Sequence, residues 1–183
     1  EALHDDVGSA SRRAAEIEDP DDVVVREGRD DARLAHESAG GVVVRRLRGG
    51  WRLAAIKPGG KDVWALPKGL VGTGEGPAET AAREVAEETG VHGRLVGKLG
   101  DVRYVYTWEG ERVFKIVSFY LARALGGRIG ELPPGMEAEV AEARWLPLAD
   151  GPRLLAHKGE REMAERALEL LEPRSWRRFA AAK

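Results

Sequence analysis

The feature that most constrains this chain is a fixed spacing of glycine, acidic and basic residues over residues 69–91. The stretch reads G-x5-E-x7-R-E-V-x-E-E-x-G-V, with its fixed letters at Gly69, Glu75, Arg83, Glu84, Glu87, Glu88 and Gly90. With each letter at a background of about 5–10%, a chance match at one start position is on the order of 10⁻⁸. The pattern therefore indicates a functional glycine loop that leads into an acidic helix.

The helix of this stretch has clear start and stop signals. Pro77 suits the first helical position, and Gly90 suits the left-handed residue that closes the last turn. Small side chains recur at helical spacing and form a narrow face that can lie close to a sheet, at Ala78, Ala81, Ala82, Val85 and Thr89. These signals predict a helix over residues 77–89.

The predicted helix gathers carboxylates on one side. Each helical residue advances about 100°, so Glu84, Glu87 and Glu88 fall within one arc. Like charges at this spacing each cost a few tenths of a kcal/mol. Arg83 is the only basic residue of this helix, with Glu79 as one possible partner, so we expect nothing basic on the helix to offset the cluster. A divalent cation could offset the negative charge of the cluster, since Mg²⁺ and Mn²⁺ favour oxygen ligands.

The loop before the helix completes the predicted site. Gly69 can bring its carbonyl to a metal without a Cβ in the way, and Lys68 beside it can place an ammonium near phosphate oxygens. Glu75 can cap helix amides or pair with Arg83. Arg83 is more plausible as an internal brace, bidentate to a carboxylate of this stretch, than as a substrate ligand.

The rest of the chain predicts one mixed α/β (α+β) domain over residues 36–173. An acidic, partly disordered tail over residues 1–35, with one short strand at residues 23–25, precedes it, and a short basic tail over residues 174–183 follows. We expect strands at residues 41–44, 51–56, 63–66, 91–96, 102–108, 112–123 and 139–146. We expect loops at residues 68–74 and 124–135, and further helices at residues 148–156 and 160–171.

Composition excludes several classes of protein. The 183 residues suffice for one domain, and the formal net charge of -2 gives no basic field for wrapping nucleic acid. The absence of cysteine excludes disulfides, thiolate metal sites and a cysteine nucleophile. No apolar run approaches the roughly 20 residues of a membrane span, and the first residues lack a signal-peptide core. We therefore expect a cytoplasmic protein without membrane contact, as a monomer or homodimer.

Residues 69–91 resemble the signature box of the Nudix hydrolases, and the resemblance extends over residues 38–171. It is strongest to the diadenosine polyphosphate hydrolase (MutT-like) group. The resemblance implies a mixed β-sheet sandwiched between helices, with the box as loop-helix-loop. It also implies that water attacks phosphorus in a substrate built on a nucleoside diphosphate, with the assistance of Mg²⁺ or Mn²⁺.

The resemblance also implies roles for the box residues. Glu84 and Glu88 become the principal metal ligands, with Glu87 as a further ligand or base and the Gly69 carbonyl as an additional ligand. An acidic residue outside the box often completes such a site. Glu139 is the best candidate here, and its close competitors are Glu137 and Glu142. Glu84, Glu87 and Glu139 all stay open as the general base.

Substrate choice depends on residues outside the box. The stretch W-A-L-P-K-G at residues 64–69 resembles the diadenosine polyphosphate hydrolases, as do residues 38–41, 113–121 and 143–148. Lys68 and Lys115 could face phosphates. Tyr104, Tyr106 or Phe114 could stack on adenine, although a core or cross-strand role is the stronger alternative for each.

The leading hypothesis is hydrolysis of dinucleoside polyphosphates such as diadenosine tetra- to hexaphosphate. A second is removal of pyrophosphate from oxidised or non-standard nucleoside triphosphates, and a third is hydrolysis of diphosphoinositol polyphosphates. Pyrophosphate removal from RNA 5′ ends is less favoured, because no basic groove is apparent. A Nudix-fold module that senses nucleotides without cleaving them is the alternative outside the enzymes.

Overall fold

The computed structural model describes residues 34–108 and 111–172. Two predicted segments lie outside the described residues: the basic tail at residues 174–183 and the acidic tail at residues 1–35 with its strand at residues 23–25. Only residues 34 and 35 of the acidic tail are described. These two residues already belong to the first strand, which begins at Leu34.

The described residues form a mixed six-stranded sheet with the order β4-β5-β1-β2-β6, and β3 pairs with β1 outside this path. Strand β1 runs parallel to β5 and antiparallel to β2 and β3. The strands are β1 (Leu34–Leu47), β2 (Gly50–Pro58), β3 (Lys68–Leu70), β4 (Val91–Trp108), β5 (Glu111–Gly127) and β6 (Val140–Pro147). The central β1 therefore carries the box loop, because β3 is part of that loop.

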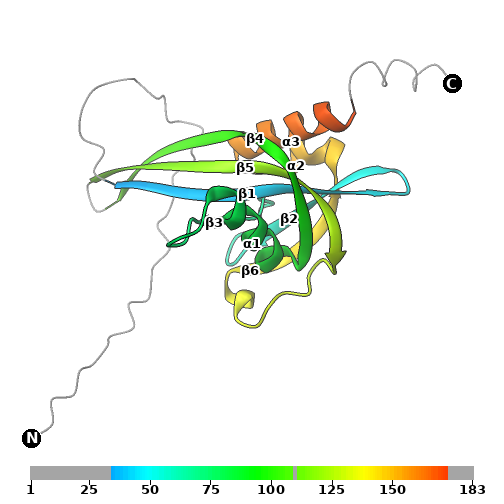
Figure 1. Ribbon diagram of the computed structural model, residues 1–183, viewed down its shortest axis with the longest axis horizontal. Helices are drawn as coiled ribbons and strands as arrows, with labels where there is room; N and C mark the ends of the chain where they lie inside the picture. The colour runs from blue at the N-terminus through cyan, green and yellow to red at the C-terminus, as the bar shows by residue number, and fades with distance from the viewer. Residues whose placement is uncertain (1–33, 109–110, 173–183) are drawn as a thin grey trace, which may run out of the picture.

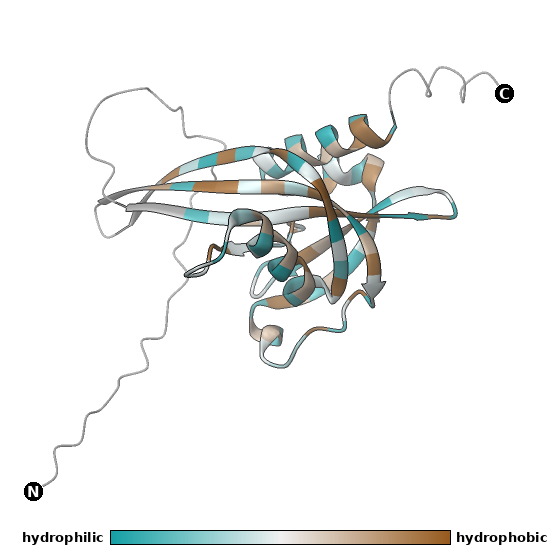
Figure 2. Cartoon of the chain, in the orientation of Figure 1, coloured by the Kyte–Doolittle hydropathy of each residue, from teal (hydrophilic) through white to brown (hydrophobic). Residues whose placement is uncertain are grey.

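Helices cover both faces of this sheet (Figure 1). Side chains alternate along β1, so Val43 packs in one core cluster with Val85 of the box helix, whereas Val42 packs in another with Met163 of the last long helix. Hydrophobic residues concentrate in the strands that cross the middle of the molecule (Figure 2). The predicted fold, a mixed sheet sandwiched between helices, is confirmed.

The box helix α1 (Pro77–Thr89) has the predicted bounds, and Gly90 ends it in the left-handed conformation with φ 74. It can approach β1 closely because Gly41 has no side chain: a Cβ there would overlap Val85. The remaining helical elements are η2 (Met136–Ala138), η3 (Leu148–Asp150), α2 (Gly151–Leu154) and α3 (Lys158–Leu171). No helix in the described ranges is long and apolar enough to cross a membrane.

Two of the predicted strands are one. Residues 91–96 and 102–108 belong to the single strand β4, which pairs with β5 along its whole length. Between the two predicted strands the pairing does not end; its register shifts between Leu95 and Gly97 and between Lys98 and Gly100. β-Bulges absorb such irregularities without ending the pairing. Strand β5 likewise extends to Gly127, into the predicted loop.

The segment before the box was also predicted wrongly. Residues 63–66 contribute only isolated bridges, whereas residues 68–70, predicted as loop, form β3. Gly40 of β1 lies against this segment. It allows the two strands to approach closely, because a Cβ on Gly40 would overlap the Pro67 carbonyl and the Lys68 side chain. Glu139 lies in the turn after η2 rather than in β6, and the predicted helix over residues 148–156 is only η3 followed by α2.

Candidate active site

Arg83 of α1 holds three carboxylates. Its Nε and Nη2 donate to both oxygens of Glu75, at 2.8 Å and 3.0 Å. Its Nη1 donates to Glu84 Oε1 at 2.7 Å and to Glu87 Oε2 at 2.8 Å. The expectation that nothing basic on the helix offsets the acidic cluster was therefore wrong. Glu79, suggested as a partner of Arg83, instead accepts the Gly76 N–H at 2.9 Å.

Glu75 fastens the loop to the helix. Besides Arg83, its Oε2 accepts the Thr80 hydroxyl at 2.9 Å and the Gly72 N–H at 3.2 Å. Hydrogen bonds from Arg83 and then from Thr80 lower the pKa of Glu75 to about 2. The guanidinium in turn has a raised pKa, chiefly through its bonds to Glu75. Glu75 and Arg83 thus brace the box at any physiological pH.

Glu84 lies against the backbone of the box loop. A Cβ added to Gly69 would overlap the Glu84 carboxylate, so the missing side chain of this glycine makes the space that the carboxylate fills. Burial raises the pKa of Glu84, its bond to Arg83 lowers it, and the charges of Glu87 and Glu139 raise it again. The carboxylate is held at the loop and surrounded by other negative charges.

Glu88 is the most buried of the box carboxylates. Its residue is 8% exposed, and its Oε2 accepts the Lys68 N–H at 2.8 Å. Burial raises its pKa to about 7 against the opposing effect of Lys68, and the charges of Glu84 and Glu139 contribute to the rise. A buried carboxylate that is costly to ionise beside two further acids is a strong candidate for a cation ligand.

Glu139 approaches this cluster from the turn after η2. Its carbonyl accepts the Gly59 N–H at 2.7 Å, and a Cβ on Gly59 would overlap the neighbouring Ala138 carbonyl. Both competitors already have partners, since Glu137 accepts the Gly135 N–H and Glu142 pairs with Lys57 and Arg144. These contacts favour Glu139 over the other two as the carboxylate from outside the box.

Lys68 has a partner that the sequence reasoning missed. Its ammonium lies 2.8 Å from Oε1 of Glu160, a residue of α3 that is 0% exposed. Glu160 Oε2 accepts the Leu66 N–H at 2.9 Å, so one carboxylate ties α3 to two residues of the box loop. Burial lowers the pKa of Lys68, but the charge and hydrogen bond of Glu160 outweigh this, and the net pKa is raised.

A signal for Glu160 was present in the sequence. Met163, Ala164 and Ala167 stand three, four and seven residues after it, so Glu160 shares the buried face of α3. A carboxylate on an apolar face requires a charged or hydrogen-bonded partner.

The other substrate candidates lie in the sheet. Lys115 of β5 pairs in register with Tyr104 of β4. Lys115 is half-buried, and burial, followed by the charge of Lys68, lowers its pKa. Tyr104 packs against the main core cluster, which fits the core alternative. The side chain of Tyr106 lies outside the described residues.

The donor set fits Mg²⁺ or Mn²⁺ because it consists of carboxylate oxygens beside a glycine carbonyl. Within residues 34–108 and 111–172, no group of three acidic or histidine side chains has the geometry of a metal site in this conformation. Arg83 engages Glu84 and Glu87 instead. A cation would therefore compete with this guanidinium for both carboxylates.

The family follows from a comparison with known domains. The NUDIX domain model matches residues 34–167, which include the whole box and both helix layers. The chain belongs to the NUDIX domain family. The family resemblance read from residues 69–91 is confirmed. Nudix hydrolases act on phosphoanhydride bonds and generally use divalent metals.

Two relatives from mycobacteria resemble this Nudix domain. A protein named MutT4 of Mycobacterium tuberculosis (strain CDC 1551 / Oshkosh) is 39% identical over 80% of this chain and 60% of its own length. An 8-oxo-(d)GTP phosphatase of Mycolicibacterium smegmatis is 33% identical over 57% of this chain and 30% of its own length. The chain thus matches about three fifths of the first relative and less than a third of the second.

Among solved structures, a C. elegans Ap4A hydrolase complex superimposes with a TM-score of 0.58. It is 21% identical and covers 74% of this chain and 97% of the hydrolase chain. At this identity the likeness supports the Nudix fold.

Proposed function

We propose that this Nudix domain catalyses the divalent-metal-dependent hydrolysis of a phosphoanhydride bond in a nucleoside polyphosphate. The observation that carries the proposal is the pair of carboxylates of Glu84, which is partly buried, and Glu88, which is buried, both held against the Lys68–Gly69 backbone. A buried acid beside a second acid disfavours folding unless a cation offsets the charges.

Glu84 and Glu88 would hold Mg²⁺ or Mn²⁺, with Glu87, Glu139 and the Gly69 carbonyl as further ligands. A bound metal supplies charge neutralisation and a lower pKa for bound water. Glu87 is a candidate base, because its side chain is 38% exposed and its bond to Arg83 uses Oε2, which leaves Oε1 to accept a proton. Glu139, exposed at its turn, is the alternative. Phosphoryl transfer needs such positioning more than covalent chemistry.

Nucleoside triphosphates with an oxidised base are the substrate class that the similarity to the 8-oxo-(d)GTP phosphatase favours. Dinucleoside polyphosphates are the second candidate, supported by the W-A-L-P-K-G stretch at residues 64–69. We place them second because Lys68 already pairs with Glu160 and Tyr104 packs on the core. Lys115 is then the candidate cation for the phosphates.

An activity panel tests the proposal. The protein is assayed with Mg²⁺ or Mn²⁺ against 8-oxo-dGTP, dGTP, diadenosine tetraphosphate and a diphosphoinositol polyphosphate, and the products are separated by ion exchange. We expect pyrophosphate and a nucleoside monophosphate from the oxidised triphosphate. Nucleotide binding without turnover of any compound would favour the sensing module, and cleavage of the dinucleotide alone would reverse the order of the two substrates.

The carboxylate variants test the residues. Glu84→Gln and Glu88→Gln should each lower kcat more than ~100-fold while the thermal transition stays cooperative. Glu79→Gln is the matched control, since it removes an exposed carboxylate from the same helix. Full activity of either the Glu84 or the Glu88 variant would remove that residue from the proposed metal site.

A further inference from the structure

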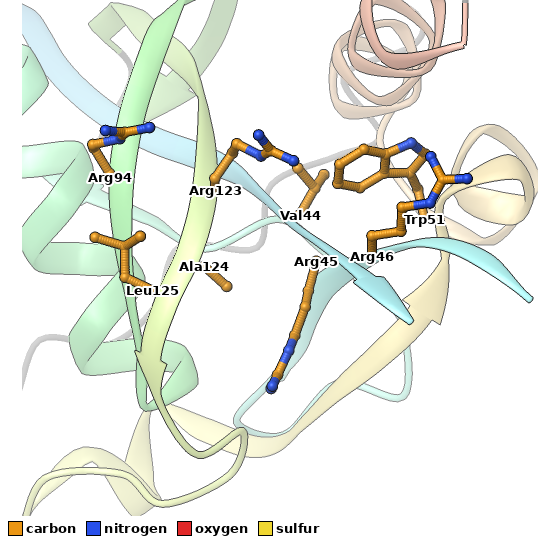
Figure 3. A pocket seen from close by; sticks show the side chains of 8 residues that line it. All are labelled: Val44, Arg45, Arg46, Trp51, Arg94, Arg123, Ala124 and Leu125. Atoms are coloured by element: carbon orange, nitrogen blue, oxygen red, sulfur yellow. The ribbon is translucent and has the colours of Figure 1, made fainter. Parts of the chain in front are cut away.

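A hollow lined by arginines lies at the end of β1 away from the box (Figure 3). Arg46 comes from β1, Arg94 from β4 and Arg123 from β5, and we call these three side chains the arginine hollow; Arg45 of β1 also lines the hollow but extends to the other side of the strand (Figure 3). Its volume is about 220 Å³. Arg45 stands five residues beyond Gly40, the β1 partner of Lys68, which is about 16 Å along a strand. The expectation that no basic groove exists was therefore wrong.

The sheet register forces these positive charges together. Arg94 stands directly opposite Arg123 in β4 and β5, so their side chains share one face of the sheet. Like charges in such positions destabilise a sheet. Within the described part of the chain, none of the three arginines of the hollow forms an ion pair with a carboxylate. The whole chain has a net charge of -2, so the concentration is local.

Trp51 orients two of these side chains. The guanidinium carbons of Arg46 and Arg123 lie 5.7 Å and 5.3 Å from the centre of its ring. The ring belongs to the main core cluster and its residue is only 8% exposed, so it is a rigid support. Cation–π contacts of this kind reduce the freedom of the guanidinium groups before any ligand arrives.

We propose that the arginine hollow binds a compact, multiply charged phosphate anion such as pyrophosphate or tripolyphosphate. Guanidinium groups bind phosphate oxygens in a bidentate manner, and an anion would relieve the repulsion between Arg94 and Arg123. Single-stranded nucleic acid is disfavoured, because its sites present exposed aromatic faces to the bases and Trp51 is buried. This second site is separate from the box and does not depend on the proposed hydrolysis.

Calorimetric titration of the full chain with tripolyphosphate, in EDTA to keep metal from the box, tests the proposal. We expect one binding site whose affinity falls at least ~10-fold in Arg94→Ala/Arg123→Ala. Arg128→Ala/Arg153→Ala is the charge-matched control, because it also removes two exposed arginines, each paired elsewhere with a carboxylate. Its affinity should stay within ~2-fold of the parent.

Three results would overturn the proposal. Unchanged affinity in the Arg94/Arg123 variant would exclude the hollow, and loss of binding in Glu84→Gln/Glu88→Gln would move the ligand to the box. Tighter binding of a short single-stranded oligonucleotide than of tripolyphosphate, lost in the same arginine variant, would replace the compact anion by nucleic acid. If the alanine variant does not fold, Arg94→Lys/Arg123→Lys keeps the charge and should still lower affinity through loss of bidentate bonding.

Discussion

A single residue, Arg83, offsets the repulsion among the carboxylates of the box. It reaches Glu84 beside it, Glu87 one turn later and Glu75 across the loop. The helical spacing of the glutamates and the bidentate pairing of Arg83 with Glu75 agree with the predictions, but the bonds of the same guanidinium to Glu84 and Glu87 were not predicted. The arrangement keeps the carboxylates gathered in the absence of a cation.

Gly69→Ala tests the contact between loop and helix. The new Cβ would overlap the Glu84 carboxylate and displace it from the loop. We expect kcat to fall at least ~10-fold with a cooperative thermal transition, since misplaced catalytic groups cost rate. Gly76→Ala in the same loop is the control, because the nearest atom to its Cβ is at an ordinary contact distance of 3.7 Å. Equal rates for both variants would contradict this role of Gly69.

Glu75→Gln should lower stability in a pH-dependent way. The pKa of Glu75 is about 2 in the folded protein and about 4.3 in an unfolded chain. Its ion pair therefore stabilises fully above about pH 4.3, and the contribution is lost as the pH falls towards 2. The difference in melting temperature between the parent and the variant should shrink from pH 7 to pH 3. A difference that is the same at both pH values would argue against this ion pair.

Among the secondary-structure elements, helix α3 is joined to the box loop by a buried carboxylate. Glu160 contacts the Leu66 amide and the Lys68 ammonium, and the Lys68 amide contacts Glu88. A helix that begins 67 residues after the end of the box, at Lys158, thus holds part of the box loop in place. This contact could not be read from local spacing, because it requires α3 to lie across the sheet from α1.

Glu160→Gln should destabilise the protein by ~1–3 kcal/mol. The amide can still accept the Leu66 N–H, but the Lys68 ammonium loses its counter-charge while its side chain is 22% exposed. Chemical denaturation measures the change. Adding Lys68→Met to Glu160→Gln should recover part of the loss, as a double-mutant cycle would show. Additive losses would mean that the two side chains are not coupled.

The strand bounds that were predicted wrongly lie beside glycines. Gly97 and Gly100 accompany bulges in β4, Gly40 allows β1 and β3 to approach each other, and Gly69 makes room for Glu84 of α1. The same residue type favours turns, bulges and close backbone contacts, and only the partner strand distinguishes them. Helices α1 and α3 were predicted well because their apolar periodicity and end signals are local.

At the scale of the whole molecule, metal and stability should be linked through Glu88. Its pKa of about 7, against about 4.3 in an unfolded chain, makes folding less favourable as the pH rises from about 4.3 to 7, and the full penalty of the buried charge is present above pH 7. In EDTA at pH 8, Glu88→Gln should therefore be more stable than the parent by ~1–3 kcal/mol. Mg²⁺ or Mn²⁺ should raise the melting temperature of the parent and not of the variant. A metal shift retained by the variant would remove Glu88 from the site.

The box helix, its ends, the acidic arc and the Nudix family could all be predicted from the order of the residues. These depend on spacings within residues 69–91, which helix geometry converts directly into positions. The packing of the folded chain was needed to show that Glu160 pairs with Lys68, that Glu139 lies near the acidic cluster, and that arginines of β1, β4 and β5 line a hollow. Those contacts depend on strand order and register, which join residues far apart in the chain and leave no periodic trace in it.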